Sequence, residues 1–358
     1  MFILRSIYNR LLCKFGLMSE LELTRVARNQ FEDKYLRYGH FPEITDAELK
    51  LYQETWPMWN IEKKDLTWAR VYKKEWGFSP YVIGNWHTLL LRNKVNPYEQ
   101  LSSFENKALC DIYFPEIPYP KAYVRRLQGV YYNEKMDVIS KEEAISLLAS
   151  IDSYVIKPAF GTMQGDGVQV VLKEKIQDNY KDFVCASIDE QTSDFIAQER
   201  LTQHPDIAKL NPTSLNCCRV TTIYIDGKFG HATNLKIGKK GSNVDNWYSS
   251  YFCGVDKEGR VMKRGYAKDL QCVTQTDSGI SLDSIVIPNY QEMVQMLESF
   301  HKKFFPNCGV IGWDITIDNK SEIRIIEANL TKPGIVAEQL AVGDFFKDFS
   351  AEINKLFK

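Results

Sequence analysis

The chain has 358 residues and a formal net charge of −1; 44% of its residues are hydrophobic and 13% are aromatic. This composition excludes a disordered chain, and the length is enough for two or three packed subdomains. Because no basic block is present, nucleic acid is not expected as a partner. No apolar run approaches a membrane span and the start lacks a secretory signal pattern, which predicts a cytoplasmic protein.

The cysteines also predict a cytoplasmic protein, and the histidines do not predict a metal site. The eight cysteines are dispersed and contain no C-x-x-C pair, a pattern typical of reduced thiols in a cytosolic protein. The five histidines are equally scattered, so a zinc site is not expected.

Residues 2–15 have the pattern of a basic amphipathic helix. Apolar residues recur at helical spacing, and Arg5, Arg10 and Lys14 occupy the remaining surface. Such a helix packs its apolar face on its own domain or lies on the anionic inner face of a membrane. We favour the first alternative, and peripheral membrane contact is the second.

The remaining chain predicts an α+β body behind a mostly helical N-terminal region. Residues 19–95 have helical patterns, and further helices are expected at residues 106–114, 141–150, 290–305 and 336–357. Strands are expected at residues 154–157, 219–225, 229–237, 309–317 and 323–328. Helices and strands that alternate in this way exclude a helical bundle.

A lysine and a glycine-rich loop follow the strand at residues 154–157. Lys157 ends the strand, and Gly161, Gly165 and Gly167 precede the next strand. Glycines let backbone N–H groups approach phosphate oxygens, and a lysine supplies the positive charge that a polyphosphate requires. The loop is neither a P-loop nor a dinucleotide fingerprint, because a strand rather than a helix follows it. A hairpin turn with a solvated lysine explains this pattern equally well.

Residues 195–201 form a short apolar strand that leads into polar residues, with Gln198 and Glu199 at the change. Such a segment can present backbone groups to an adenine edge and an acidic side chain to a ribose. An ordinary buried strand is the alternative.

Residues 313–318 and 323–329 predict an antiparallel hairpin. Because side chains alternate along a strand, Glu327 and Asn329 project from one face, and Asp314 can face them from the partner strand. Oxygen ligands grouped in this way suit a hard cation such as Mg²⁺. The apolar neighbours of these residues favour this site over a solvated surface hairpin.

In combination, these elements resemble the ATP-grasp superfamily. The resemblance implies an α+β fold in which two α+β subdomains clamp ATP, while an aspartate and a Glu-x-Asn strand hold two Mg²⁺ ions. It implies Mg²⁺ ligands at Asp314, Glu327 and Asn329. The implied ATP-binding residues are Lys107, Lys157, Gly161, Thr162, Gly165, Gly167, Gln198 and Glu199.

A narrower resemblance covers about residues 80–350. The segments 199–205, 214–222 and 241–246 look like the sugar-transfer-associated ATP-grasp family, whose members sit in polysaccharide, capsule and O-antigen biosynthesis. The chain then divides into an N-terminal helical region (1–95), a small subdomain with the lysines and the glycine loop (96–200) and a C-terminal subdomain with the metal site (201–358). The family is usually more glycine-rich where this chain has residues 247–251, a departure that concerns the acceptor site.

The resemblance also implies a reaction. ATP phosphorylates a substrate carboxylate to an acyl phosphate, and an amine then attacks it to form an amide. Arg219 is the implied contact of the transferring phosphoryl group, with a structural salt bridge as its alternative. Lys236 and Lys332 are weaker candidates for binding the carboxylate, with solvated surface lysines as the alternative.

The predicted function is an ATP-dependent carboxylate–amine ligase. Its substrates would be an amino acid and a uronic-acid sugar, carried on a nucleotide or a lipid, in polysaccharide biosynthesis. One alternative is an ATP-grasp kinase that transfers phosphate directly to a sugar or small molecule. The other is a non-catalytic nucleotide-binding scaffold, which would have no need of paired metal carboxylates.

Overall fold

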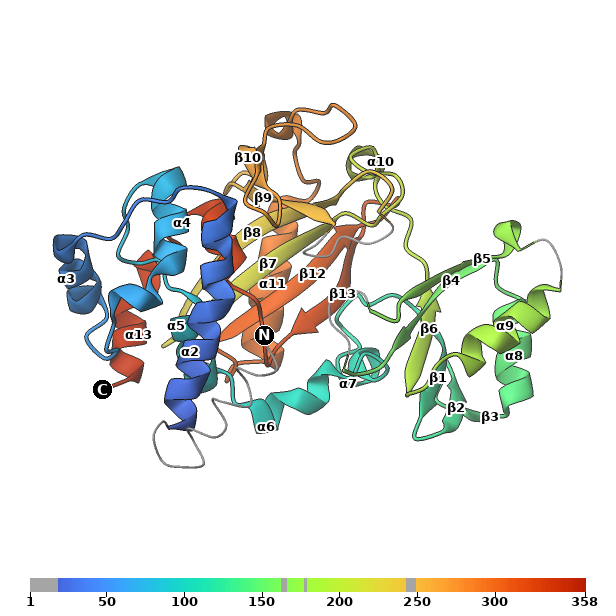
Figure 1. Ribbon diagram of the computed structural model, residues 1–358. Helices are drawn as coiled ribbons and strands as arrows, with labels where there is room; N and C mark the ends of the chain where they lie inside the picture. The colour runs from blue at the N-terminus through green and yellow to red at the C-terminus, as the bar shows by residue number, and fades with distance from the viewer. Residues whose placement is uncertain (1–18, 162–165, 177–178, 243–248) are drawn as a thin grey trace.

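The computed structural model describes residues 19–161, 166–176, 179–242 and 249–358 (Figure 1). The predictions for the helix at residues 2–15, for Thr162 and Gly165, and for residues 243–248 lie outside these described residues. Among the helices of the described ranges, none is long and apolar enough to cross a membrane.

One of the two sheets has six antiparallel strands in the order β3-β2-β1-β6-β4-β5. Helices α8 (Lys141–Ala149) and α9 (Tyr180–Asp189) pack on it and share its core (Figure 1). A capping box between Ser140 and Glu143 begins α8. The strands are β1 Ala122–Leu127, β2 Val130–Asn133, β3 Val138–Ile139, β4 Ser153–Pro158, β5 Gln169–Leu172 and β6 Phe195–Glu199.

The other sheet has seven antiparallel strands in the order β11-β10-β9-β8-β7-β12-β13. Its last two strands are the predicted hairpin, with Asp314 directly opposite Glu327. The strands are β7 Cys217–Ile225, β8 Lys228–Gly238, β9 Ser250–Val255, β10 Val261–Tyr266, β11 Cys272–Val273, β12 Val310–Ile317 and β13 Ile323–Asn329.

The two faces of the seven-stranded sheet differ in what covers them. On one face, Val220 and Trp313 form a core with helix α11 (Tyr290–Phe304). On the other face, Ile223 and Val310 pack against the N-terminal helices. Because side chains alternate along a strand, Arg219 on β7 shares this second face, so one face carries an apolar core at one end and charged residues at the other.

The N-terminal region is helical, as expected, and it packs on the seven-stranded sheet and on the C-terminal helices (Figure 1). The Gln339 side chain donates to the Ile83 carbonyl at 2.8 Å and accepts from the Ile83 N–H at 2.9 Å. The helices are α2 Glu20–Asp33, η1 Lys34–Tyr38, α3 Asp46–Thr55, η2 Lys63–Asp65, α4 Thr67–Trp76 and α5 Asn85–Val95.

Residues 96–121 connect the N-terminal region to β1, and here the prediction of a helix at residues 106–114 is wrong for its first half. The segment contains α6 (Tyr98–Leu101), η3 (Ser102–Glu105) and the single turn α7 (Cys110–Tyr113). The Asn106 side chain accepts from the Ala108 N–H at 3.0 Å, and the Lys107 N–H donates to the Ala159 carbonyl at 3.0 Å. These bonds replace helical ones, because asparagine competes for nearby backbone N–H groups.

The predicted helix at residues 336–357 is divided in two. Helix α12 (Val336–Val342) ends at Gly343, whose φ of +103° is a conformation that glycine adopts readily. The chain then turns through η6 (Lys347–Phe349) into α13 (Ser350–Leu356). Other short elements are η4 Lys173–Lys175, α10 Pro205–Ala208 and η5 Leu282–Ser284.

We expect the Gln339→Met variant to lose stability. It leaves both buried backbone groups of Ile83 without their partner, which lowers the free energy of unfolding by about 2–4 kcal/mol. Urea denaturation of the full chain measures this loss. Gln100→Met, at an exposed position of α6, is the control, and equal effects of the two substitutions would contradict the prediction.

Candidate nucleotide and metal site

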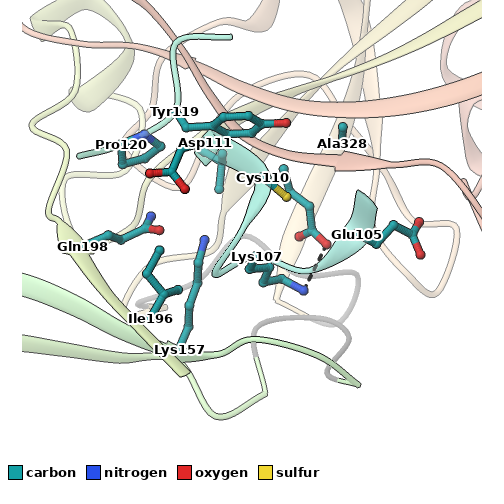
Figure 2. A pocket seen from close by; sticks show the side chains of 12 residues that line it. Glu105, Lys107, Cys110, Asp111, Tyr119, Pro120, Lys157, Ile196, Gln198 and Ala328 are labelled. Atoms are coloured by element: carbon teal, nitrogen blue, oxygen red, sulfur yellow. Dashed lines mark ion pairs between the residues drawn. The ribbon is translucent and has the colours of Figure 1, made fainter. Parts of the chain in front are cut away.

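A pocket lies between the two sheets and the segment that connects the N-terminal region to β1 (Figure 2). The six-stranded sheet contributes Lys157, Ile196 and Gln198. The seven-stranded sheet contributes Ile326, Glu327 and Ala328. The connecting segment contributes Glu105, Lys107, Cys110, Asp111, Tyr119 and Pro120.

The two lysines predicted to bind phosphates both reach into this pocket (Figure 2). Lys157 stands near the end of β4 and is only 7% exposed, and burial lowers the pKa of its ammonium group. Lys107 comes from the connecting segment, and its Nζ lies 3.2 Å from Glu327 Oε1. The charges of Lys107 and Glu327 both act on Lys157, so the two lysines lie near one carboxylate.

The glycine loop begins beside Lys157, and its described ends have backbone conformations that favour glycine. Gly161 has a φ of +78° and Gly167 a φ of +73°. A Cβ atom on Gly167 would lie 2.8 Å from Pro158 Cγ, so this position excludes any side chain. The loop thus leaves and rejoins the sheet next to the pocket.

Gln198 and Glu199 end β6, but their surroundings differ. Gln198 is 6% exposed and lines the pocket. The Glu199 carboxylate accepts a hydrogen bond from Arg324 Nη2 at 2.6 Å and is one-third exposed. Glu199 is therefore engaged with β13, the strand that carries Glu327.

A row of charged side chains crosses the seven-stranded sheet from the pocket. Asp314 on β12 lies directly opposite Glu327 on β13 and Arg219 on β7. Arg219 is opposite Asn234 on β8, and Lys236 lies two residues further along the same face. Directly opposite residues have Cβ atoms about 5 Å apart, so the row joins Glu327 and Asp314 to Arg219 and Lys236.

A β-bulge explains how the edge strand β13 lines the pocket. Asp314 pairs with Glu327, but the next pair is Ile315 with Ile325, so Ile326 has no directly opposite residue. Bulges are frequent next to active sites because they change the direction of side chains. Three consecutive residues of β13 can therefore line one pocket.

Asp314 is the centre of the ion pairs in this row. Its carboxylate accepts from Arg219 Nε at 2.9 Å and from Arg219 Nη2 at 2.7 Å, and Lys236 Nζ lies 2.9 Å away. Burial alone would raise the pKa of Asp314, but these two cations outweigh it and hold the pKa well below its usual range. Asp314 is thus a carboxylate at every physiological pH.

Asn329 completes a set of oxygen atoms that fits Mg²⁺. Its Nδ2 donates to the Gly312 carbonyl at 3.0 Å and approaches Asp314 Oδ2 at 3.3 Å, which leaves Oδ1 as an acceptor. In the described part of the chain, no three His, Cys, Asp or Glu side chains are grouped so that they could hold a metal ion by themselves. Mg²⁺ is usually bound by one or two carboxylates together with substrate phosphates and water, and Asp314, Glu327 and Asn329 match that arrangement.

The structure separates the three residues predicted to act in catalysis. Arg219 and Lys236 lie in the charged row, with side chains 18% and 13% exposed. Lys332 is exposed, and its Nζ lies 5.8 Å from the centre of the Tyr98 ring. The structure therefore does not bring Lys332 to Asp314.

Sequence reasoning missed Glu338, which lies near this row. It stands on α12, is 4% exposed, and burial raises the pKa of its carboxyl to about 7. The charges of Arg219, Lys236 and Asp314 all act on it. Its one sequence signal is an acidic residue in the apolar helix that follows the Pro-Gly turn.

Sequence reasoning also missed Glu105. Its carboxylate accepts from the backbone N–H groups of Leu330 and Thr331 at 2.7 Å and from the Thr331 hydroxyl at 2.6 Å. It therefore fixes the chain directly after Asn329.

We expect Mg²⁺ and nucleotide to bind with positive coupling, since Asp314 and Glu327 are paired with cations that phosphates would attract. Isothermal titration should show weak Mg²⁺ binding without ADP and tight binding with it. Lys236→Met should raise Mg²⁺ affinity without nucleotide about fivefold, roughly 1 kcal/mol, because Asp314 loses a counter-ion. Lys263→Met, at an exposed position of β10, is the control, and equal affinities in both variants would refute this account.

We expect Glu338→Gln to change how stability depends on pH. The folded state keeps the Glu338 proton up to about pH 7, whereas the unfolded state releases it near 4.5. The free energy of unfolding of the wild type should therefore fall relative to the variant across this range, by about 1 kcal/mol per pH unit. Urea denaturation of both proteins across the range measures the difference, and a constant difference would contradict the assignment.

The comparisons with known proteins agree with this geometry. Residues 88–355 match the family described as sugar-transfer associated ATP-grasp. No curated protein matches the sequence.

Solved structures that are similar to this chain have low sequence identity to it. D-alanyl-alanine synthetase A from Vibrio cholerae is 11% identical over 71% of this chain and 64% of its own, with a TM-score of 0.41. D-cycloserine synthetase is 12% identical over 71% and 70%, with a TM-score of 0.42. An L-amino acid ligase from Bacillus licheniformis is 10% identical over 71% and 48%, with a TM-score of 0.38.

The chain spans less than two thirds of the length of the first and third of these proteins. The family match nevertheless covers most of the chain and confirms the predicted ATP-grasp fold. The chain belongs to the sugar-transfer associated ATP-grasp family.

Proposed function

We propose that the protein is an ATP-dependent carboxylate–amine ligase that forms an amide through an acyl phosphate. The observation that supports this most is the charged row. Lys107 and Lys157 lie at the pocket between the sheets, and Glu327, Asp314 and Arg219 occupy directly opposite positions, with Lys236 Nζ 2.9 Å from Asp314. The cations that we propose for phosphate binding thus adjoin the oxygens that we propose for metal binding, as phosphoryl transfer requires.

The reaction has two steps. A carboxylate oxygen attacks the γ-phosphorus of ATP, the bond to the β-γ bridging oxygen breaks, and ADP leaves. The amine then attacks the acyl carbon and loses a proton, and the C–O bond to phosphate breaks to release phosphate and the amide. The first step brings two anions together and the second releases a phosphate anion, so the site must supply positive charge.

The residues have distinct tasks in this proposal. Lys107 and Lys157 would hold the ATP phosphates, while Arg219, whose planar guanidinium suits oxyanions, would contact the transferring phosphoryl group. Asp314, Glu327 and Asn329 would hold two Mg²⁺ ions. The metal ions would supply the positive charge that lets a carboxylate approach the triphosphate.

The substrates we propose are an amino acid and a uronic-acid sugar, carried on a nucleotide or a lipid, in the biosynthesis of a capsule or another polysaccharide. The family description, sugar-transfer associated, supports a sugar-linked substrate. Lys236 supports a carboxylate substrate, because its positive charge would attract a carboxylate. It lies in the charged row, on the side of Arg219 away from the pocket.

The test is the release of ADP and phosphate with pairs of amino acids and uronic-acid nucleotides or lipid-linked glycans. A productive pair should release both products and form an amide, whereas a kinase would release ADP without free phosphate. ATP binding without turnover by any pair would favour a scaffold.

We expect Glu327→Gln to reduce turnover at least a hundredfold, because one metal ligand and one charge are lost. Steady-state ADP release measures this. Glu322→Gln, an exposed residue before β13, is the matched control and should retain turnover. Full activity of Glu327→Gln would refute the metal site.

A further inference from the structure

Helix α12 covers the end of the charged row that is farthest from the pocket. It packs across β8 and β9, and the approach is close: a Cβ atom on Gly254 would lie 2.1 Å from the Ala341 carbonyl oxygen. Gly254 is directly opposite Asn234 in the sheet. Because Glu338 lies one helical turn before Ala341, α12 places this carboxyl near Asn234.

Three buried oxygen atoms in this region have no hydrogen-bond partner among the described residues. They are Glu338 Oε2, Asn234 Oδ1 and Thr221 Oγ1. Thr221 is fully buried, Asn234 is 1% exposed and Glu338 is 4% exposed. An unpartnered buried polar group typically costs about 1–3 kcal/mol, so three in one region require a reason beyond the packing of α12.

The strand register places these atoms next to the reacting groups. Asn234 is directly opposite Arg219, and Thr221 lies on the same face, two residues further along β7. The order across the sheet is Glu327, Asp314, Arg219, Asn234. Asn234 therefore lies beyond Arg219, on the side opposite to the nucleotide pocket, and Thr221 lies beside Arg219 on the same strand.

The chemistry of this group favours a cation that donates hydrogen bonds. A carboxylate oxygen and an amide oxygen only accept, and a hydroxyl can accept. An ammonium group has three N–H donors and a positive charge, which matches three acceptor oxygens of which one is anionic once Glu338 has released its proton.

We propose that Glu338, Asn234 and Thr221 form the subsite that binds the protonated amino group of the amine substrate. This inference rests on the proposed ligase function and adds to it the residues that select an amine. Nucleotide at one end of the row and amine at the other leave Arg219, between them, beside the acyl phosphate. Glu338 is then a specificity residue for the attacking substrate.

The test measures amino acid binding to the full chain saturated with Mg²⁺ and ADP. The twenty standard L-amino acids and their 2-hydroxy analogues, such as alanine and lactate, are compared by thermal shift and then by isothermal titration. At least one amino acid should bind, and its hydroxy analogue should bind at least tenfold more weakly. Glu338→Gln should weaken the amino acid at least tenfold and leave the hydroxy analogue unchanged, because only the ammonium group interacts with the carboxylate.

Two variants keep the result clear. Thr221→Val should reduce the preference for the amino acid over its hydroxy analogue severalfold. Glu292→Gln, at an exposed position of α11, should have no effect. Unchanged amino acid affinity in Glu338→Gln, or no amino acid binding by the wild type, overturns the subsite. Failure of the wild type to bind Mg²⁺ and ADP would instead refute the ligase proposal itself.

Discussion

The site depends on one physical constraint: a carboxylate inside a protein must be compensated by nearby charge. Asp314 is 8% exposed and accepts hydrogen bonds from Arg219 while Lys236 lies within 3 Å. A carboxylate buried without such partners would be neutralised rather than charged. The cations that stabilise the fold here are the same ones that phosphates and a carboxylate substrate would attract. One set of charges therefore stabilises the protein without ligand and also serves ligand binding.

The N-terminal helices belong to this arrangement as well. They cover the apolar end of the sheet face whose polar end carries Asp314, and Gln339 connects them to α12 through both backbone groups of Ile83. The neighbouring residue on α12 is Glu338. The described residues before residue 96 thus support α12, although none of them lines the pocket between the sheets.

The local parts of the site were predictable, and the long-range parts were not. Alternation along two strands was enough to predict that Asp314, Glu327 and Asn329 share one face, and the register confirms it. The start of a helix at residue 106 was predicted wrongly, because a hydrogen bond from Lys107 to Ala159 overrides helical propensity. Glu338 carried no motif; its burial and its neighbours arise from the packing of α12 on β8 and β9, which no local pattern contains.

The hydrogen bond from the Lys107 N–H to the Ala159 carbonyl affects how the two sheets can move relative to each other. Ala108 packs with Ala122, Ala159 and Ile196 of the six-stranded sheet, whereas Leu101, earlier in the same segment, packs in the core of the seven-stranded sheet. The connecting segment is thus attached to both sheets: the Lys107 backbone to the strand that carries Lys157, and Leu101, Phe114 and Ile117 to the core of the seven-stranded sheet. A rotation of one sheet against the other would therefore deform this segment, and the 3.2 Å separation between Lys107 and Glu327 would respond to it.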